Sequence, residues 1–354
     1  MDAAVKAKVE KLFGGVARTR DGATNNPKGI VSSNTQFPTA LREAEARAYP
    51  RTMPGFYHQP IRRRDFLKAS CLAGATVVLH GCRTSPGASS STANEIHLAL
   101  LSDTHIGGDR ERAKDPRGGF DPWENLHRVV PEVIARAPRG IILNGDAASR
   151  EGLAVDYQEL KTLLEPLSRV APVYIGLGNH DHRENFKQVF TSAPGLNADV
   201  RNHHVLVIEE SFLRFIVLDS LFYVAKAAGL LGAHQRWWLT EYLKTHTEKP
   251  VILFVHHTLG EGDGDLLDAD RLFEIIRPHR QVKAIFYGHS HTWNIGERQG
   301  VKLINLPALG YNFSEDQPVG WVDARFRRDG VDLALHAIAG NRAQDGQTTR
   351  VIRT

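Results

Sequence analysis

Seven side chains of types that bind metal ions follow hydrophobic segments of this chain. The segments are LALLSDTH, GIILNGD, PVYIGLGNHD, PVILFVHH and AIFYGHSH. The seven candidates are Asp103, His105, Asp146, Asn179, His256, His289 and His291. Carboxylate, amide and imidazole ligands without thiolates favour borderline first-row cations over soft metals. Seven ligands are enough for two metal ions with one carboxylate between them.

The hydrophobic segments predict strands whose ends must meet if these side chains are to act together. The expected strands are 96–102, 140–144, 172–177, 204–209, 213–218, 251–255, 283–287, 301–305, 319–327 and 331–338, and the expected helices are 123–137, 155–169, 233–246 and 268–277. Strand ends from one sheet converge, so residues far apart in sequence can share a pocket there. Early strand–helix alternation followed by strand pairs predicts an α/β fold, a four-layer α/β/β/α sandwich of two mixed β-sheets flanked by helices.

Local spacing supports the cluster at three of these strand ends. Gly145, Gly178 and Gly288 each precede a candidate ligand, where the chain must turn sharply or approach a metal closely. His289 and His291 are two residues apart, so in extended chain both imidazoles point the same way.

The motifs D-x-H, G-D, G-N-H-D, H and G-H-x-H occur in this order within residues 97–310, and the order resembles the calcineurin-like metallophosphoesterase family. The resemblance implies that Asp103, His105 and His291 hold one metal ion, that Asn179, His256 and His289 hold a second, and that Asp146 bridges them. It also implies two divalent or trivalent ions (Mn, Fe or Zn), and a hydroxide between them that hydrolyses phosphomonoesters or phosphodiesters. The implied partner is a small-molecule phosphate ester.

The predicted catalytic set is completed by three residues that follow Asn179 closely in the sequence. His180 is similar to the proton donor of the family, and Asp181 is expected to orient its imidazole. Arg183 is a candidate contact for a phosphate oxygen. His257 stays an alternative to His256 as a ligand.

The resemblance is closest to the class III cyclic nucleotide phosphodiesterase branch. His105 and Ser149 stand where purple acid phosphatases have glycine and tyrosine, which argues against that branch. The segments around AIFYGHSH and GVKLINLPALGYNF are more similar to the class III branch, but they do not select a substrate. A specific cyclic nucleotide phosphodiesterase remains an alternative. A non-catalytic binding protein is a further one, although all seven ligands and His180 are present.

The basic leader predicts export from the cytoplasm. Residues 63–68, RRDFLK, resemble a twin-arginine signal, and the uncharged stretch 69–79 suits its hydrophobic region. LHGC, ending at Cys82, is similar to a lipobox, so the expected partners are the twin-arginine export machinery and the membrane through an N-terminal lipid. The expected location is periplasmic or lipid-anchored. Translation that begins at Met53 would give this signal a basic N-terminal region of ordinary length.

Composition divides the chain into a basic N-terminal segment and a mildly acidic remainder. Residues 1–82 hold 13 Lys+Arg and 6 Asp+Glu, which leaves 31 and 34 in residues 83–354, so nucleic-acid binding gains no support. The expected organisation is an untranslated or disordered extension at 1–60, the signal at 61–82, a Ser-rich linker at 83–94, the metallophosphoesterase domain at 95–340 and a polar tail at 341–354. The helix 233–246 carries an apolar stripe of helical period that is expected in the core: Trp237, Trp238, Leu239, Tyr242 and Leu243.

Overall fold

The computed structural model describes residues 94–114, 119–191, 194, 196–198 and 200–352. The predicted extension at 1–60, the signal at 61–82 and most of the linker at 83–94 lie outside these residues. The first strand, β1 (Glu95–Leu101), begins where the sequence predicts the start of the domain.

Six strands form the first sheet, in the order β13-β12-β11-β1-β2-β3. Their bounds are β1 (Glu95–Leu101), β2 (Gly140–Asn144), β3 (Val173–Gly176), β11 (Pro318–Arg327), β12 (Gly330–Gly340) and β13 (Thr348–Ile352). Strands β1, β2 and β3 run parallel, whereas β11 pairs antiparallel with β1 and β12. The sheet is therefore mixed, as the sequence predicts.

Seven strands form the second sheet, in the order β4-β5-β6-β7-β8-β10-β9. Their bounds are β4 (Leu196–Ala198), β5 (Val205–Glu209), β6 (Arg214–Val217), β7 (Val251–Phe254), β8 (Val282–Tyr287), β9 (Asn294–Arg298) and β10 (Val301–Asn305). Its centre, β6-β7-β8-β10, is parallel, and both edges are antiparallel.

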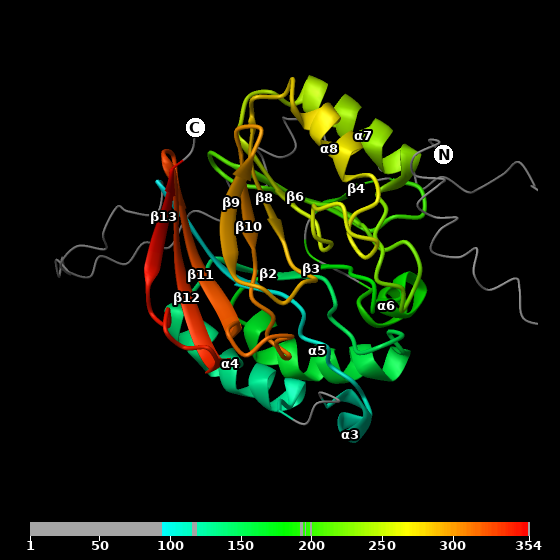
Figure 1. Ribbon diagram of the computed structural model, residues 1–354, viewed down its shortest axis with the longest axis vertical. Coiled ribbons are helices and arrows are strands. Elements are labelled where there is room, and N and C mark those ends of the chain that lie inside the picture. Colours follow the sequence, from blue (N-terminus) through cyan, green and yellow to red (C-terminus); the bar gives the residue numbers. More distant parts are fainter. Residues whose placement is uncertain (1–93, 115–118, 192–193, 195, 199, 353–354) are drawn as a thin grey trace, which may run out of the picture. The chain divides into compact units, whose positions relative to one another are not determined.

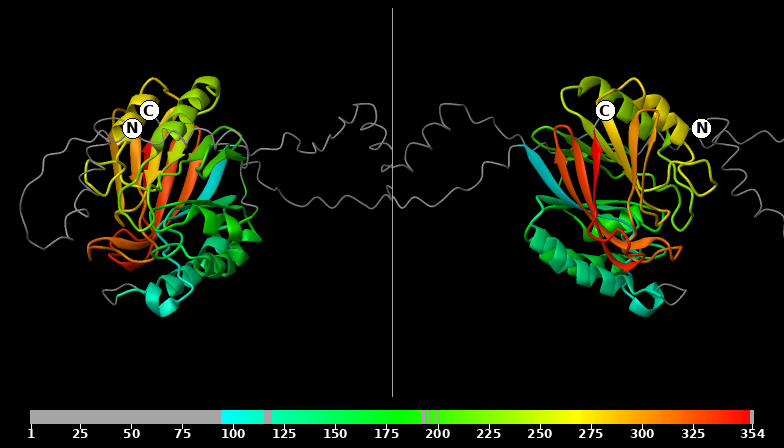
Figure 2. Two further views of the ribbon diagram at one scale, coloured as in Figure 1. Left: turned by 90° about the vertical axis from the view of Figure 1, so that its right-hand side faces the viewer. Right: turned by 60° about the vertical axis from the view of Figure 1, so that its left-hand side comes forward.

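The two sheets pack face to face with helices on both outer faces. Apolar residues between the sheets include Leu98, Phe215, Phe254, Phe286 and Phe326. The helices α4 (Pro122–Arg136) and α5 (Ala154–Ser168) cover the first sheet, and α7 (Gly232–Thr245) and α8 (Ala269–Ile276) cover the second (Figures 1 and 2). The predicted four-layer α/β/β/α sandwich is confirmed. Two short helices, α3 (Arg110–Ala113) and α6 (Arg183–Val189), lie in connecting segments.

Helix α4 shows how local sequence sets the element bounds. The Asp121 side chain accepts from the backbone N–H groups of Trp123 and Glu124, and Pro122 occupies the first turn, where it displaces no helical hydrogen bond. The helix ends at Ala137, which adopts a left-handed conformation with φ 49°.

One expectation about the chain is wrong, and a second is wrong for a single residue. Residues 341–354 are not only a polar tail, because β13 pairs antiparallel with β12 through residues 348–352 and thereby extends the first sheet. The sequence of β13 is TTRVI, and only Val351 is buried. One buried residue in five is too weak a pattern to identify an edge strand from sequence. The stripe of α7 is confirmed for Trp238, Leu239, Tyr242 and Leu243, which belong to or pack against the core, but Trp237 is 68% exposed. Among the described residues, no helix has the length and apolar character needed to cross a membrane.

Candidate metal centre

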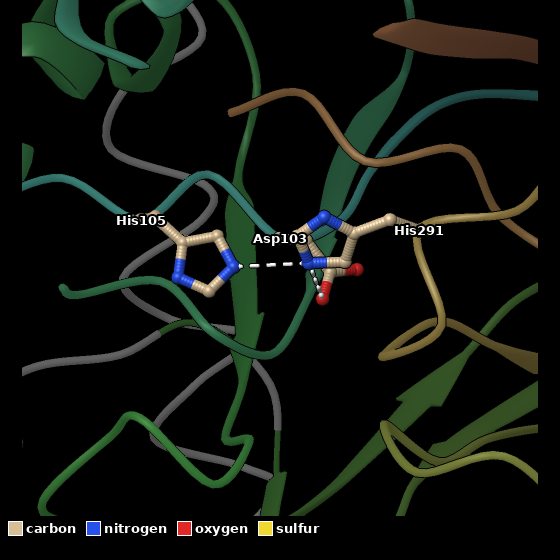
Figure 3. A group of neighbouring side chains, drawn as sticks. All are labelled: Asp103, His105 and His291. Carbon is tan, nitrogen blue, oxygen red and sulfur yellow. Dashed lines mark hydrogen bonds and ion pairs between the residues drawn. The ribbon is translucent and has the colours of Figure 1, made fainter. Parts of the chain in front are cut away.

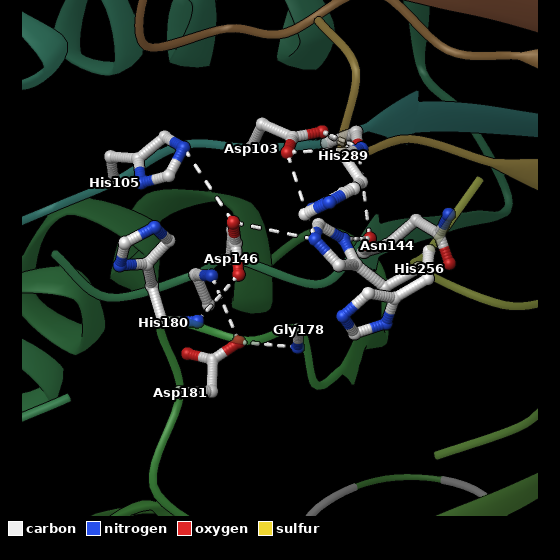
Figure 4. A network of polar contacts seen from close by, with 12 residues as sticks. Asp103, His105, Asn144, Asp146, Gly178, His180, Asp181, His256 and His289 are labelled. Carbon is white, nitrogen blue, oxygen red and sulfur yellow. Dashed lines mark hydrogen bonds and ion pairs between the residues drawn. The ribbon is translucent and has the colours of Figure 1, made fainter. Parts of the chain in front are cut away.

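The candidate ligands meet at one end of both sheets. Asp103, Asp146 and Asn179 follow β1, β2 and β3 of the first sheet, while His256 follows β7 of the second sheet. His289 and His291 follow β8, also of the second sheet. The sequence predicts convergence at the edge of one sheet. The structure instead brings together the carboxyl ends of parallel strands from two sheets, as Figure 4 shows for most of these side chains.

Asp103, His105 and His291 form one half of the cluster (Figure 3). His291 Nε2 lies 3.4 Å from Asp103 Oδ1 and 3.2 Å from His105 Nε2. All three side chains are buried, so they face one another and not solvent. His291 Nδ1 donates to the Tyr311 carbonyl at 2.6 Å, which leaves Nε2 as the nitrogen that can bind a metal.

Asp146, His256 and His289 form the other half. His256 Nε2 lies 3.3 Å from Asp146 Oδ2, and the His256 and His289 ring centroids are 5.3 Å apart. Asp146 also lies 3.8 Å from His105 Nε2, so this carboxylate connects the two halves (Figure 4). Asn179 is 3% exposed.

Two atoms of this half are buried without a hydrogen-bond partner, and this is the strongest sign that a metal fits the site. They are Asn179 Oδ1 and His256 Nε2. A buried polar atom that has lost water and gained no partner costs free energy. Coordination of a cation by the amide oxygen and the imidazole nitrogen would remove that cost. The donor set therefore fits the metal ions that the family resemblance implies.

The structure favours His256 over His257 as the ligand. His256 Nδ1 donates to the Asn144 carbonyl at 2.9 Å, which directs Nε2 toward Asp146. His257 Nδ1 instead pairs with Ser220 Oγ at 2.7 Å. Both rings are buried, but only His256 stands within the groups of potential ligands.

The electrostatics put most of these groups in the protonation states that metal binding needs, and His256 is the exception. Burial by itself would lower the pKa of His256, but Asp146 and Asp103 outweigh it and raise the pKa to about 10, so a metal ion must displace that proton. Burial lowers the pKa of His105 to about 3 and that of His289 to about 4, so both imidazoles are neutral at neutral pH. Burial by itself would raise the pKa of Asp103, but the neighbouring His256 and His291 outweigh it and hold the pKa at about 2. Neutral imidazoles and ionised carboxylates are the forms that coordinate metals.

Five of the seven ligands adopt backbone conformations that L-residues rarely occupy. The φ angles are positive for Asp103 (53°), His105 (48°), Asp146 (46°), His289 (70°) and His291 (53°). Such conformations persist only where the surrounding structure enforces them, and they concentrate at functional sites. The strain thus coincides with the cluster.

The glycines before the ligands have the role that the sequence predicts. Gly145 has φ +85°, and a Cβ on Gly178 would lie 2.3 Å from Asp146 Oδ1. A Cβ on Gly288 would lie 2.6 Å from Asp103 Oδ2. Larger residues at these positions would push the ligands apart.

His180 lies beside the cluster, but its predicted partner is wrong. His180 Nδ1 contacts the Arg150 carbonyl at 2.8 Å, and its ring lies edge-on to His105 at 5.2 Å. The carboxylate of Asp181 accepts instead from the backbone N–H groups of Ala147, Ala148 and Gly178 and from the Tyr157 hydroxyl. Asp181 therefore holds the loops that carry Asp146 and Asn179, rather than orienting the His180 ring.

Arg183 has a protein partner. Its Nε lies 2.6 Å from Asp219 Oδ2 and a terminal nitrogen lies 2.9 Å from Asp219 Oδ1, a bidentate pair with a fully buried carboxylate. This pairing competes with the phosphate contact predicted from sequence.

The family comparison agrees with this geometry. The family model described as calcineurin-like phosphoesterase matches residues 96–293, more than half of the chain. The chain belongs to the calcineurin-like phosphoesterase family.

Individual relatives of this phosphoesterase carry two kinds of name. A probable glycerophosphodiester phosphodiesterase of Arcobacter nitrofigilis is 30% identical over 203 residues, covering 55% of this chain and 71% of that one. A 3′,5′-cyclic adenosine monophosphate phosphodiesterase of Haemophilus influenzae is 29% identical over 255 residues, covering 66% and 87%. Among solved structures, a dimetal phosphatase from Danio rerio has a TM-score of 0.58 at 13% identity, covering 73% of this chain and 99% of that one. That likeness shows that the fold is shared with a dimetal phosphatase.

Sequence reasoning missed two contributors to this phosphoesterase site. Tyr311 stacks on His105 with ring centroids 4.8 Å apart, and Phe313 stacks on His291 at 4.0 Å. Both belong to the segment ALGYNF, which resembles the class III branch but contains none of the predicted metal ligands. Its contact with the cluster became visible only in the fold.

Proposed function

We propose that this chain is a metal-dependent hydrolase of phosphomonoesters or phosphodiesters that works with two ions of Mn, Fe or Zn. Asp103, His105 and His291 would hold one ion, Asn179, His256 and His289 the other, and Asp146 both. The observation that carries the proposal is the convergence of six of the seven ligands, together with the buried Asn179 Oδ1, which lacks a hydrogen-bond partner. A pair of bound cations lowers the pKa of water and neutralises charge on phosphate oxygens.

The chain's own residues keep this site ready for that chemistry. The carbonyls of Asn144 and Tyr311 fix the rings of His256 and His291 by accepting from their Nδ1–H groups. The Asp181 carboxylate holds the backbone of the loops that follow β2 and β3. Side chains positioned in this way need little reorganisation when a substrate binds.

His180 is the proposed proton donor to the leaving alkoxide. The Arg150 carbonyl can only accept a hydrogen bond, so His180 Nδ1 carries a proton and the ring is held through it. Nε2 is then the nitrogen free to give a proton to an ester oxygen at the cluster, because His180 groups with His105 and Asp146. In this arrangement the imidazolium form donates through Nε2 and stays anchored through Nδ1.

A cyclic nucleotide or a glycerophosphodiester is the narrower substrate choice. Relatives named for both reactions share 29–30% identity with this chain. A non-catalytic binding role is less consistent with the site, because such a role does not need six converging ligands, five of them in strained conformations.

Turnover of p-nitrophenyl phosphate and bis-p-nitrophenyl phosphate tests the proposal. Purified protein loaded separately with Mn, Fe or Zn should release p-nitrophenolate from at least one of the two esters, and the Asp146→Asn variant should not. Rates no higher than those of the variant with all three metals would refute the enzyme function. The ratio of the two rates would show whether monoesters or diesters are preferred.

We also propose that the leader exports the folded, metal-loaded protein by the twin-arginine route, with Met53 as the initiator. RRDFLK and the uncharged stretch after it support export, and LHGC supports lipid attachment at Cys82. Such a protein would act outside the cytoplasmic membrane, where hydrolysis of phosphate esters releases phosphate. Fractionation of cells that express the wild type and an Arg63→Lys/Arg64→Lys variant tests this route. Activity of both proteins in the cytoplasm alone would contradict it.

A further inference from the structure

Two aromatic rings cover one half of the metal-binding cluster. Tyr311 stacks on His105 with an interplanar angle of 27°, and Phe313 stacks on His291 with an angle of 14°. The two aromatic rings meet edge to face at 5.9 Å. Phe313 is 57% exposed although it touches a buried ligand. An apolar ring therefore extends from the metal cluster toward solvent.

The segment that carries these rings is pinned to the ligand loops. The backbone N–H of Leu309 donates to the Ser102 carbonyl at 2.9 Å, and that of Gly310 donates to the Asp103 carbonyl at 2.8 Å. A Cβ on Gly310 would lie 3.0 Å from the same Asp103 carbonyl, so the two segments are in close contact. The His291 ring adds a third link through the Tyr311 carbonyl.

A helix on the other side of the segment holds it as well. Asn125 of α4 donates through Nδ2 to the Leu309 carbonyl at 3.0 Å and to the Gly310 carbonyl at 2.9 Å. Asn312 Nδ2 donates to the Gln317 carbonyl at 2.7 Å. The backbone on either side of Phe313 is therefore fixed relative to the metal ligands. A ring held in this way loses little conformational entropy when another ring stacks on it.

The opposite side of the cluster is built differently. His289 packs against the imidazoles of His256 and His257. The Gly-rich loop 258–267 lies beside it, since a Cβ on Gly264 would be in ordinary contact with His289 Nε2, at 3.9 Å. Polar, glycine-rich chain borders that half, whereas fixed aromatic rings border the half with His105 and His291.

We propose that Phe313, supported by Tyr311, is a specificity platform that binds a flat aromatic group on the phosphorus of a diester substrate. The proposal rests on the phosphoesterase function above and names the class of ester within it. A phosphoryl group held at the cluster directs its ester substituents away from the ligands, and those on the His291 side pass the Phe313 ring. Offset stacking of two aromatic rings stabilises such a complex, whereas a methyl ester gains little from it.

Two diesters with the same leaving group test the platform. Bis-p-nitrophenyl phosphate and methyl p-nitrophenyl phosphate both release p-nitrophenolate, so their kcat/KM ratio reports the recognition of the second ester group. Phe313→Ala should lower this ratio by about 3- to 10-fold, the range expected for one lost aromatic pair. Phe313→Trp should keep it near the wild-type value, because a ring remains over His291.

Trp237→Ala provides the matched control, because Trp237 is 68% exposed on α7, which covers the outer face of the second sheet. This variant should leave the ratio unchanged. An equal loss with both diesters in Phe313→Ala, or a ratio that does not change, would overturn the platform: Phe313 would then only position His291. Metal content measured on each variant separates that positioning effect from loss of the ion. If the wild type turns over neither diester with any of the three metals, the proposed function itself fails, and the platform fails with it.

Discussion

Two buried polar networks of this phosphoesterase lie close together in the fold and are built in opposite ways. The metal cluster holds Asp146 and Asp103 among imidazoles, with unpartnered buried atoms and positive φ angles. The second network centres on Asp219, which is also fully buried. Its carboxylate accepts from the Arg183 side chain and from the backbone N–H groups of His204 and Leu221.

The difference separates a site prepared for a ligand from a site that is already complete. The backbone of Asp219 is satisfied as well, since Gln235 both donates to its carbonyl and accepts from its N–H. No residue from 217 to 221 is among the described non-glycine residues with positive φ. A satisfied buried network supports the fold, whereas one with unpartnered atoms depends on a bound group. Replacing a carboxylate should therefore change activity in one network and stability in the other.

Asp146→Asn should produce the largest effect, and chiefly on activity. Loss of the shared carboxylate is expected to lower kcat by about 10³-fold, because charge stabilisation at the reacting phosphate depends on it. The free energy of unfolding of the metal-free protein should fall by about 3 kcal/mol at most, because Asn keeps the shape of the side chain but leaves the His256 ring without its nearest carboxylate. Turnover of bis-p-nitrophenyl phosphate and urea unfolding of metal-free protein measure the two quantities. A large stability loss with activity retained would reverse the comparison.

Arg183→Met should act on stability. The substitution leaves Asp219 buried without its cationic partner, which should cost about 3 kcal/mol of unfolding free energy. KM should not change if the guanidinium only pairs with Asp219. A raised KM with unchanged stability would instead support the phosphate contact predicted from sequence. Urea unfolding and steady-state kinetics on the same preparation distinguish the two outcomes.

The matched amide substitution, Asp219→Asn, should cost less than Arg183→Met. The Arg183 side chain is 22% exposed, so the unpaired guanidinium can still reach water, and a loss of about 2 kcal/mol is expected. The folded protein should keep its kcat, in contrast to Asp146→Asn. The double variant with Arg183→Met should lose less than the sum of the single losses, because both changes remove one ion pair. Strict additivity would show that the pair is not coupled.

The sequence predicted the layers of this fold and the ligands of its cluster for the same reason. Hydrophobic segments such as IHLALL and PVILF identify buried strands by composition alone. Each ligand lies within a few residues of the end of such a segment, so its position in the fold follows from that of the strand. The half-exposed edge strands β9 and β13 have no such signal, because their burial depends on only one neighbouring strand. Element type was therefore predictable mainly where packing on both faces constrains the residues.

The side-chain partners around the cluster were not predictable in this way. Asp181 precedes Arg183 by two residues, yet it holds backbone amides, and Arg183 pairs with Asp219 far along the chain. Such partners depend on how loops from different strands pack, and no local pattern encodes that packing. Phe313 illustrates the same limit, because its position over His291 follows from the route of the segment after β10.

The smallest expected effect concerns the pH dependence of the Asp219 network. Burial lowers the pKa of His204 below its ordinary value of 6.5. The neutral ring is held by Nε2, which donates to the Ile175 carbonyl at 2.9 Å, and it packs edge-on to Phe186. A histidine with a depressed folded pKa stabilises the fold above its unfolded pKa, and this stabilisation is lost as the pH falls below about 6.5.

His204→Gln removes the titrating group but keeps an amide donor for the Ile175 carbonyl. The wild type should therefore lose more thermal stability than this variant between about pH 7 and about pH 5, while the two should respond alike above pH 7. His203→Gln is the matched control, because the His203 ring contacts the nearby Arg201 carbonyl instead of the core and should leave the wild-type pH profile unchanged. Melting temperatures recorded across this range on metal-free protein measure the difference. Parallel profiles for the wild type and His204→Gln would show that protonation of His204 does not destabilise the fold. The Asp219 network would then tolerate a charged imidazole beside it.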